Sequence, residues 1–525
     1  MILILDFGSQ YTQLIARRIR EFKVYCEIYP YNLKLSEVGD KISEIKGVIL
    51  SGGPESVYEK SAPKITKEFL SYFLTKNIPV LGICYGMQML AYLLKGEVVK
   101  GKIHEYGFSK VFINTTSLLF KNIPNKEFFV WMSHSDTVKF LPKEMKKIVT
   151  TENGLIAGFE DKEKKVFGLQ FHPEVKHTQN GSQIIKNFVF EICKEKSNWK
   201  MEDFINSAIE NIKNQVGDAK VICALSGGVD SSVAAYLVYR SIRKQLHCVF
   251  VDNGLLRFGE KERIKKIFEP LFGKTFVKNN LHIIDATDLF LKKLRNISDP
   301  ETKRKIIGKT FIEVFEETAK KIQKKIGSII PFLVQGTLYP DVIESISVKG
   351  PSKTIKTHHN VGGLPKKLKF KLIEPLKFLF KDEVRILGKK LGLPDEILFR
   401  HPFPGPGLAV RVIGCVSRER LELLRRSDKI IEEEIMFSGL YNKIWQSFGV
   451  LLPIKTVGIM GDNRTYENVL AIRAVESEDA MTADWYRLPY DLLKKISNRI
   501  INEVRGINRV VYDISSKPPA TIEWE

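Results

Sequence analysis

The sequence lacks the features that mark membrane and secreted proteins. No apolar run approaches the roughly 20 residues needed to cross a bilayer, so no membrane association is expected. The first ten residues, MILILDFGSQ, carry none of the basic residues that open a signal peptide. These absences predict a cytoplasmic globular protein.

Cysteine is also scarce. The 525 residues include six cysteines, and no two of them form a CxxC pair. This spacing argues against both a disulfide framework and a zinc site. Most of the cysteines are therefore expected to be packing residues.

Acidic residues are in deficit, because 61 Asp and Glu accompany 82 Lys and Arg and leave a formal charge of +21. Basicity of this size is one mark of nucleic-acid-binding proteins. The lysines are dispersed, however, and no nucleic-acid-binding motif accompanies them. We expect no nucleic-acid partner. The alternative is a basic scaffold with inactive motifs, which would bind oligonucleotides in a salt-dependent way without turnover.

Short apolar runs alternate with helical stretches, which predicts an α/β fold built on two parallel sheets. The expected strands of the first sheet are residues 2–5, 47–50, 79–83 and 166–171. Those of the second sheet are residues 221–225, 247–251, 282–284 and 332–335. A helical stripe at 306–326 is expected to pack on the second sheet.

The segments after this helix are less regular. Residues 340–365 show little periodicity and suit a mobile functional loop. The proline-glycine cluster HPFPGPG at 401–407 marks a boundary. Helices and apolar strands follow it, including 469–475 and 509–514. The chain length agrees with roughly three domains.

The first reactive group is expected in GICYGMQ, residues 82–88. Glycines on both sides of Cys84 permit the sharp strand-to-helix turn of a nucleophile elbow. Cys84 would then lie at a helix N-terminus, which favours the reactive thiolate. His172 and Glu174 end another expected strand, and their alternation directs both side chains to one side. Together the three predict a relay of the kind that cysteine acyl-transfer enzymes use.

The turn SGGP at 51–54 also follows an expected strand. The N–H groups of Gly53 and Tyr85 are candidates for binding an oxyanion. Cys84 or His172 taken alone would more often be a packing residue. The elbow, the His172–Glu174 pair and the glycine turn together make that interpretation improbable.

These motifs resemble the class I glutamine amidotransferase domain over most of residues 1–195. The resemblance implies a glutamyl thioester on the cysteine and release of ammonia. It also implies that glutamine is held by Gln88 and by residues of SHSD at 133–136, namely Ser133, His134 and Asp136. Ser135 departs from the glycine that is usual in related synthetases, which puts glutamine affinity in question if a side chain matters there.

SGGVDSS at 226–232 follows an expected strand and opens a helix, so its N–H groups predict an anion cradle. The loop lacks the lysine of a Walker motif, which argues against ordinary γ-phosphoryl transfer. Asp230 beside phosphates would require a cation, and Mg²⁺ is the natural one.

The loop resembles that of the ATP pyrophosphatases, which have an adenine-nucleotide α-hydrolase-like fold and adenylate an oxygen. The resemblance implies that ATP contacts the loop and the element at 251–257, where Asp252 and Asn253 are candidates. The implied loop contacts are Ser226, Gly227, Gly228, Val229, Asp230, Ser231 and Ser232.

The whole chain resembles the glutamine-hydrolysing GMP synthetase family. The motifs that carry the resemblance include QGTLYPDVIES at 335–345, TIKTHHNVGGLP at 354–365 and KPPATIEWE at 517–525. It implies an amidotransferase domain at 1–197, an ATP pyrophosphatase domain at 198–400 with a lid loop at about 340–365, and an α+β dimerisation domain at 401–525. A homodimer is therefore expected.

The same resemblance implies the residues of the nucleotide site. Asp341 and Glu344, with Asp230, would hold Mg²⁺. Arg304, Lys517 and Glu523 would bind xanthosine monophosphate (XMP). The implied lid residues are Asp341, Glu344, Lys356, Thr357, His358 and His359.

The reaction expected is XMP, ATP, glutamine and water giving GMP, AMP, pyrophosphate and glutamate. Two other acceptors share the chemistry: the nicotinate adenine dinucleotide of NAD synthetases, and a tRNA uridine. Thiolation of a uridine would need a sulfur-relay cysteine near the loop, and the likeness of the C-terminal region opposes both alternatives.

Overall fold

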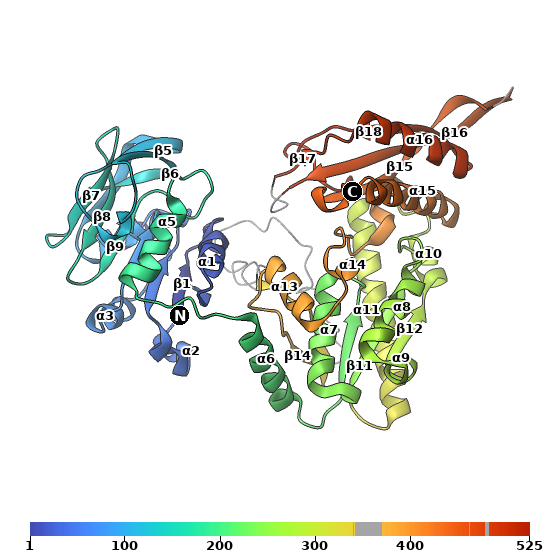
Figure 1. Ribbon diagram of the computed structural model, residues 1–525, viewed down its shortest axis with the longest axis horizontal. Coiled ribbons are helices and arrows are strands. Elements are labelled where there is room, and N and C mark those ends of the chain that lie inside the picture. Colours follow the sequence, from blue (N-terminus) through green and yellow to red (C-terminus); the bar gives the residue numbers. More distant parts are fainter. Residues whose placement is uncertain (340, 342–369, 461–462, 478–481) are drawn as a thin grey trace. The chain divides into compact units, whose positions relative to one another are not determined.

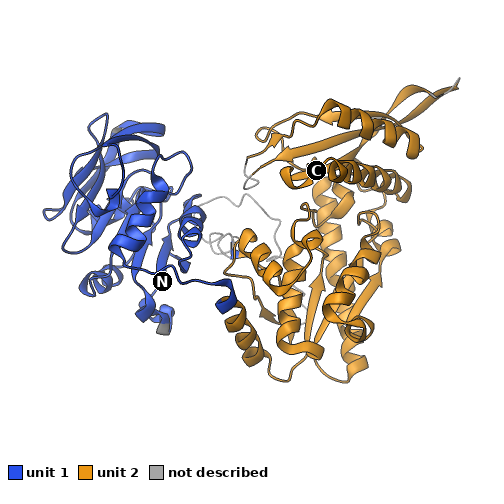
Figure 2. Cartoon of the chain, viewed as in Figure 1, with its two compact units in different colours: residues 1–203, 339–357 blue, residues 204–338, 358–525 orange. Residues whose placement is uncertain are grey.

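The computed structural model describes residues 1–339, 341, 370–460, 463–477 and 482–525. The chain divides into two compact units (Figure 2). Of the described residues, 1–203, Tyr339 and Asp341 belong to the first unit, while 204–338 and 370–525 belong to the second. The strands and helices of each unit are shown in Figure 1, and each unit has its own hydrophobic core.

The first unit is built on a nine-stranded sheet in the order β2-β1-β3-β4-β9-β8-β7-β5-β6. The strands from β2 to β9 in this order run parallel. The sequence predicts four of these five strands, and β2 was not predicted. These parallel strands are β1 (Ile2–Asp6), β2 (Cys26–Pro30), β3 (Gly47–Leu50), β4 (Val80–Ile83) and β9 (Val166–Leu169). Their side chains are almost all buried, because helices cover both faces of such a sheet.

The other half of this sheet is antiparallel and was not predicted from the sequence. It consists of β5 (Glu97–Ile113), β6 (Glu127–Phe140), β7 (Lys146–Thr151) and β8 (Ile156–Asp161). In β6 exposed and buried side chains alternate over much of the strand, so its sequence alternates instead of forming an apolar run. The helices of the unit are α1 (Thr12–Glu21), α2 (Leu35–Val38), α3 (Lys67–Thr75), α4 (Tyr85–Leu93) and α5 (Gly181–Lys186).

The second unit contains a five-stranded parallel sheet in the order β12-β11-β10-β13-β14. Its strands are β10 (Val221–Leu225), β11 (Leu246–Asp252), β12 (Leu281–Asp285), β13 (Phe332–Val334) and β14 (Lys371–Ile373). The helix expected at 306–326 starts earlier, as α11 (Pro300–Ile326), because Asp299 caps it and proline occupies its first position. The other helices here are α6 (Met201–Val216), α7 (Val229–Ile242), α8 (Glu260–Phe272), α9 (Lys274–Asn280), α10 (Thr287–Leu294), α13 (Lys381–Leu391) and α14 (Asp395–Leu398).

The C-terminal region adds a sheet in which β16 pairs with β15, β17 and β18. Its elements are β15 (Gln446–Met460), β16 (Asn463–Glu476), β17 (Asp484–Trp485), β18 (Ile507–Asp513), α15 (Arg418–Phe437) and α16 (Tyr490–Glu503). One hydrophobic core joins both sheets of the second unit, since Val249 and Phe290 belong to the same cluster as Leu424 and Leu470. This shared core explains why residues 204–338 and 370–525 form a single compact unit.

Candidate active sites

Cys84 lies between β4 and α4, at the turn that its flanking glycines predict. Its φ of 52° and ψ of −108° are unusual for a residue with a side chain and store backbone strain. A Cβ on Gly86 would lie 2.3 Å from the Leu50 carbonyl oxygen, and one on Gly82 would lie 2.4 Å from that of Gly86. The turn therefore requires glycine at both positions, and it presents the thiol at the start of a helix.

His172 and Glu174 follow β9, beside the cysteine. The His172 Nδ1 and a Glu174 carboxylate oxygen are 2.7 Å apart, and His172 also interacts with the Cys84 thiol. Burial, the largest influence, lowers the pKa of His172, but the Glu174 carboxylate and Cys84 together raise it well above its ordinary value. The structure thus brings the three predicted residues together in one relay.

The histidine ring is fixed by packing as well as by Glu174. The edge of the Tyr11 ring meets it, with the ring centroids 4.9 Å apart. A Cβ on Gly52 would lie 3.1 Å from the His172 Cε1, so the glycine turn lets the imidazole approach. Within the described residues, the N–H groups of Gly53 and Tyr85 donate to no protein acceptor. Both remain available to an oxyanion.

The predicted glutamine-holding residues form a connected polar network. The Gln88 amide donates to the Asp136 carbonyl oxygen at 3.0 Å, and the His134 Nδ1 lies 3.0 Å from the same oxygen. The thiol of Cys84 donates to the Ser133 carbonyl oxygen at 3.7 Å. All four residues named for glutamine therefore lie on α4 or β6, around the cysteine.

Two members of this network were not found from the sequence. Gln170 donates to the Cys84 sulfur at 3.7 Å and accepts from Gln88 at 3.2 Å. Glu105 lies 3.1 Å from the His134 Nε2. Burial acts to raise the pKa of Glu105, but hydrogen bonds from His134 and Asn153 lower it overall. Gln170 could have been found from the sequence because it lies two residues before His172. Glu105, on β5, has no sequence motif near it.

Ser135 lies on β6 opposite an irregular stretch of β5, where the pairing shifts between Lys100 and Glu105. Its main-chain oxygen faces Gly101, where an added Cβ would approach it to 2.6 Å. Its side chain is half-buried. The effect of this serine on glutamine affinity stays a prediction.

The loop at 226–232 consists of residues 226–228, which join β10 to α7 in the second unit, and of the first turn of α7. Gly227 has a φ of +76°, which suits glycine. The hydroxyl groups of Ser226 and Ser231 are 2.9 Å apart, and Ser232 donates to the Gly228 carbonyl oxygen at 2.8 Å. The predicted anion cradle thus stands at the N-terminus of a helix.

Three charged residues that surround this loop were missed. Lys381 donates to a carboxylate oxygen of Asp230 at 2.6 Å. Arg400, which is buried, donates to the Gly227 carbonyl oxygen at 3.4 Å and pairs with the buried Glu260 through both carboxylate oxygens. These residues are distant in sequence from the loop, and only the fold brings them to it.

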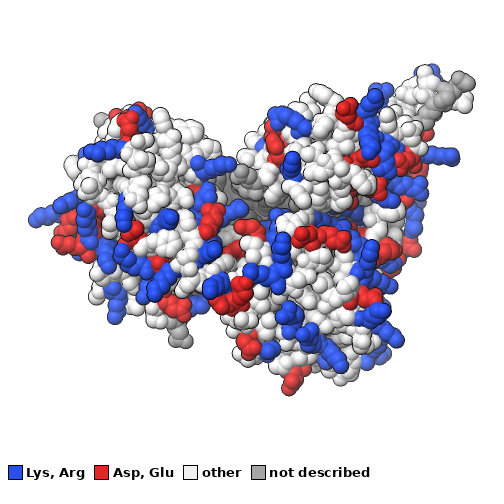
Figure 3. Space-filling view, viewed as in Figure 1, with Lys and Arg blue, Asp and Glu red and all other residues white. Residues whose placement is uncertain are grey.

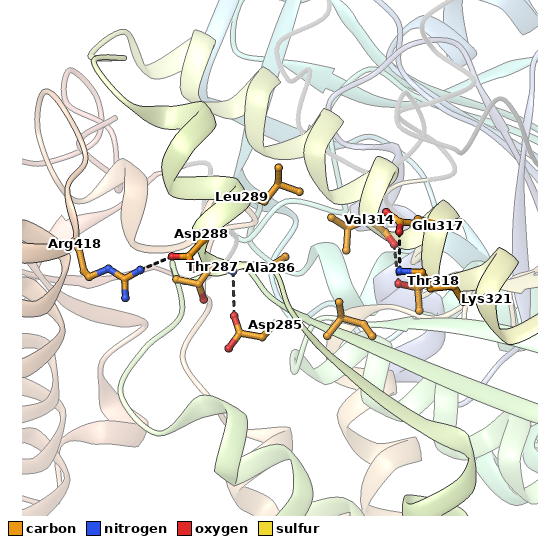
Figure 4. A pocket seen from close by; sticks show the side chains of 11 residues that line it. Asp285, Ala286, Thr287, Asp288, Leu289, Val314, Glu317, Thr318, Lys321 and Arg418 are labelled. Atoms are coloured by element: carbon orange, nitrogen blue, oxygen red, sulfur yellow. Dashed lines mark hydrogen bonds and ion pairs between the residues drawn. The ribbon is translucent and has the colours of Figure 1, made fainter.

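The adenosine-side element follows β11. Asp252 accepts from the Gly254 N–H at 3.0 Å and lies 3.7 Å from the Lys261 ammonium, while the Asn253 side chain accepts from the Leu255 N–H at 3.0 Å. A cavity of about 520 Å³ opens one strand further, at the end of β12 (Figure 4). Four of its charged lining residues form two ion pairs, Arg418 with Asp288 and Lys321 with Glu317. None of the predicted ATP contacts lines it.

Of the predicted lid residues, the structure describes Asp341, which is half-buried. The other five, Glu344, Lys356, Thr357, His358 and His359, lie outside the described residues, as does nearly all of the segment 340–365.

The residues predicted for XMP lie on α11 and in the C-terminal segment. Arg304 donates to a main-chain oxygen of Glu525 at 2.5 Å. Glu523 accepts from Arg411 at 2.9 and 3.1 Å and from Gln446 at 2.8 Å. Lys517 forms a two-way main-chain bridge with Ala483. Arg304 is thus bonded to Glu525 of the short segment 523–525, which also carries Glu523. Lys517 is bonded instead to Ala483.

Three family models match consecutive parts of the chain. The family model "Glutamine amidotransferase class-I" matches residues 3–192, "Thiamine biosynthesis protein (ThiI)" matches 217–330 and "GMP synthase C terminal domain" matches 433–524. The curated "GMP synthase [glutamine-hydrolyzing]" of Chlorobium chlorochromatii is 56% identical, over 100% of this chain and 99% of the relative. That of Aquifex aeolicus is 54% identical over the same shares.

The chain belongs to the family of glutamine-hydrolysing GMP synthases. A solved structure of a glutamine amidotransferase from Thermotoga maritima is 25% identical and covers 41% of this chain and 85% of its own, with a TM-score of 0.28. Membership of this synthase family makes the chain a ligase of purine biosynthesis with an amidotransferase domain.

The face of the molecule seen in Figure 3 shows no separate basic patch. Lys and Arg side chains there are interspersed with Asp and Glu. Among the described residues, no helix is long and apolar enough to span a membrane. The absence of a nucleic-acid partner stays a prediction.

Proposed function

We propose that this chain makes GMP from XMP, with glutamine as the nitrogen donor and ATP as the activating substrate. Glutamine hydrolysis at Cys84 supplies ammonia, ATP adenylates the base oxygen of XMP, and ammonia displaces AMP. The observation that carries the proposal is the full-length likeness to synthases named for glutamine hydrolysis and GMP formation. The thiol relay and the anion loop supply the chemistry that such a reaction needs.

In the first half-reaction, His172 accepts the thiol proton and the Cys84 sulfur attacks the glutamine amide. Gly53 and Tyr85 donate their N–H groups to the oxyanion of the tetrahedral intermediate. Collapse of that intermediate releases ammonia and leaves a thioester, which water hydrolyses to glutamate. Glu174, 2.7 Å from His172, orients the ring and stabilises its charged form.

In the second half-reaction, the loop 226–232 holds the ATP phosphates and Asp252 holds the adenosine side. The XMP oxygen attacks the α-phosphate, and pyrophosphate leaves. AMP is then a good leaving group, so ammonia displaces it at the carbon and gives GMP. Arg304 and Lys517 suit the XMP 5′-phosphate, and the Glu523 carboxylate suits a purine N–H.

Mg²⁺ fits the residues present at the loop. One carboxylate oxygen of Asp230, Oδ1, is buried and makes no hydrogen bond within the described part of the chain, while the other is bound to Lys381. A hard cation prefers such oxygen ligands. Asp230 would hold the metal together with Asp341 and Glu344, and the metal would neutralise charge on the phosphates.

The alternative acceptors are less well supported. Thiolation of a tRNA uridine would need a sulfur-relay cysteine near the loop, and the family model "Thiamine biosynthesis protein (ThiI)" covers residues 217–330. The cysteines in that range are Cys223 and Cys248, and both are buried in the sheet. Burial and a hydrogen bond with Cys223 raise the pKa of Cys248, whereas a sulfur relay needs an accessible thiolate.

We further propose a cytoplasmic homodimer that pairs through the C-terminal region, from about residue 401 onward, with domains at 1–197, 198–400 and 401–525. In Figure 1 the free end of the β15–β16 hairpin extends past α16. Large apolar side chains are exposed there, including Ile459 at 81% and Tyr466 at 65%. Apolar patches of this kind mark protein interfaces. Light scattering of Ile459→Lys should show a monomer where the native chain is dimeric; an unchanged dimer would contradict this interface.

The overall reaction is tested with the purified chain, XMP, ATP, Mg²⁺ and ammonium. Chromatography should show GMP, AMP and pyrophosphate in equal amounts. ADP as the co-product would contradict adenylation, and conversion of nicotinate adenine dinucleotide in preference to XMP would contradict the acceptor.

A further inference from the structure

Lys303, on the first turns of α11, is a fully buried cation. Its side chain is 0% exposed. The ammonium donates to the carbonyl oxygens of Ala409 at 3.2 Å and Val412 at 2.9 Å, and it pairs with the side chain of Glu525. A buried ammonium is costly unless an opposite charge compensates it. Within the described residues, Glu525 is the carboxylate that provides this compensation.

Glu525 makes two further contacts that fix its position. Its other carboxylate oxygen accepts from the Gly414 N–H at 3.2 Å, and a main-chain oxygen accepts from Arg304 at 2.5 Å. The residue therefore ties the segment 523–525 to α11 and to the segment that ends at Gly414. The Arg304 guanidinium thus has two partners, the main chain of Glu525 and the carboxylate of Glu301 at 3.6 Å, and Glu525 is the one that links it to the C-terminal segment.

Glu523, two residues before Glu525 in the chain, is held in a similar way. Arg411, which is 0% exposed, binds both of its carboxylate oxygens, and the Arg411 guanidinium lies 4.0 Å from the centre of the Phe448 ring. Both acidic side chains of the segment 523–525 thus end on buried cations, Lys303 and Arg411. Two fixed points two residues apart restrict the conformation of this segment.

We propose that Glu525 is a positioning residue of the XMP site. By neutralising Lys303 it holds the segment that carries Glu523 and orients Arg304, and it acts on XMP through those two residues. The inference rests on the proposed function, in which Arg304 and Glu523 bind XMP. It predicts that the charge of Glu525 affects XMP binding without affecting ATP binding or the thiol centre.

The test uses Glu525→Gln, which keeps the shape of the side chain and removes its charge. The KM for XMP in the ammonia-dependent reaction should rise about 10-fold or more, because one buried charge is left unpaired. The KM for ATP and kcat at saturating XMP should stay within about 2-fold, as expected when only uniform binding is lost. Calorimetric titration with XMP alone should show the same loss of affinity.

The double variant Lys303→Gln with Glu525→Gln removes both charges and should recover most of the XMP affinity. Glu503→Gln is the matched control, because Glu503 belongs to an exposed ion pair with Arg499 on α16. It should leave XMP affinity unchanged. If Glu525→Gln does not fold, Glu525→Asp keeps the charge on a shorter side chain and should show a smaller rise in the KM for XMP.

Equal XMP affinity in native and Glu525→Gln chains would overturn the inference, as would an equal loss for ATP and XMP. No XMP binding or turnover by the native chain would instead contradict the proposed function. The two failures are thereby distinguished.

Discussion

The thiol centre around Cys84 and the anion loop at 226–232 both lie where a buried parallel strand gives way to a helix, yet their polar groups are satisfied differently. At the thiol centre, Cys84, His172 and Glu174 already contact one another. At the anion loop, the serine hydroxyls bond to each other, and Asp230 is bound to Lys381. The thiol centre is thus preorganised by its own residues, whereas the loop must exchange internal partners for phosphate and metal.

This difference indicates how each centre should respond to substitution. A preorganised relay fails when any member is removed, because no ligand can replace it. A loop whose groups exchange partners should lose ligand binding and catalysis together. The two centres lie in separate compact units, so damage to one should spare the other.

The largest effect is expected from Cys84→Ala. Without the nucleophile, the glutamine-dependent rate should fall more than about 10⁴-fold. The ammonia-dependent rate should stay within about 2-fold of native, because the second unit does not use the thiol. Both rates are measured by GMP formation. Equal loss of both would mean that Cys84 is a structural residue.

Asp230→Asn should reduce both rates, by about 10²–10³-fold, since it removes charge where metal and phosphate meet. The measurement is GMP formation with glutamine and with ammonium, at saturating ATP. Asp288→Asn, in the exposed Asp288–Arg418 pair, is the control and should be silent. A selective loss of the glutamine reaction would contradict the role of Asp230.

Glu174→Gln should lower the glutamine-dependent kcat about 10²-fold. It should also alter the pH profile, because Glu174 helps to hold the pKa of His172 above its ordinary value. Because the pKa of His172 is raised in the folded chain, the protonated ring contributes to stability. This contribution to stability is complete below the ordinary histidine pKa and is lost as the pH rises through the raised pKa of His172. The alkaline limb of the glutamine reaction should therefore move to lower pH in the variant. An unmoved limb would mean that another group sets it.

Gln170→Ala should have the smallest effect. The variant removes a neutral hydrogen bond to the Cys84 sulfur and one from Gln88, each worth about 1 kcal/mol. The KM for glutamine should rise roughly 5-fold, with the ammonia reaction unchanged. A comparable loss of the ammonia reaction would show damage beyond the thiol centre.

The sequence predicts a large part of this comparison. Most of the parallel strands, the Cys84 elbow and the loop 226–232 are encoded locally, in apolar runs and glycine spacing, whereas β2 and β14 were not predicted. The relay from Cys84 to His172 could be proposed because both residues end strands of one expected sheet. The residues predicted to bind ATP and XMP were proposed from the resemblance of the chain to known families.

Other features could not be predicted because their partners are distant in sequence. Lys381 is 151 residues from its partner Asp230, and Arg400 is 173 residues from its partner Gly227. The alternating sequence of β6 forms no apolar run, and the contact between Lys303 and Glu525 depends on tertiary packing. Local periodicity contains no information on such contacts.

The central claim is that nitrogen released at Cys84 is the nitrogen that enters GMP. It is tested most directly by supplying glutamine labelled with ¹⁵N in its amide, together with XMP, ATP, Mg²⁺ and unlabelled ammonium, and weighing the GMP by mass spectrometry. The native chain should produce labelled GMP, and Cys84→Ala should produce only unlabelled GMP. Unlabelled GMP from a native chain that is hydrolysing glutamine would contradict the account.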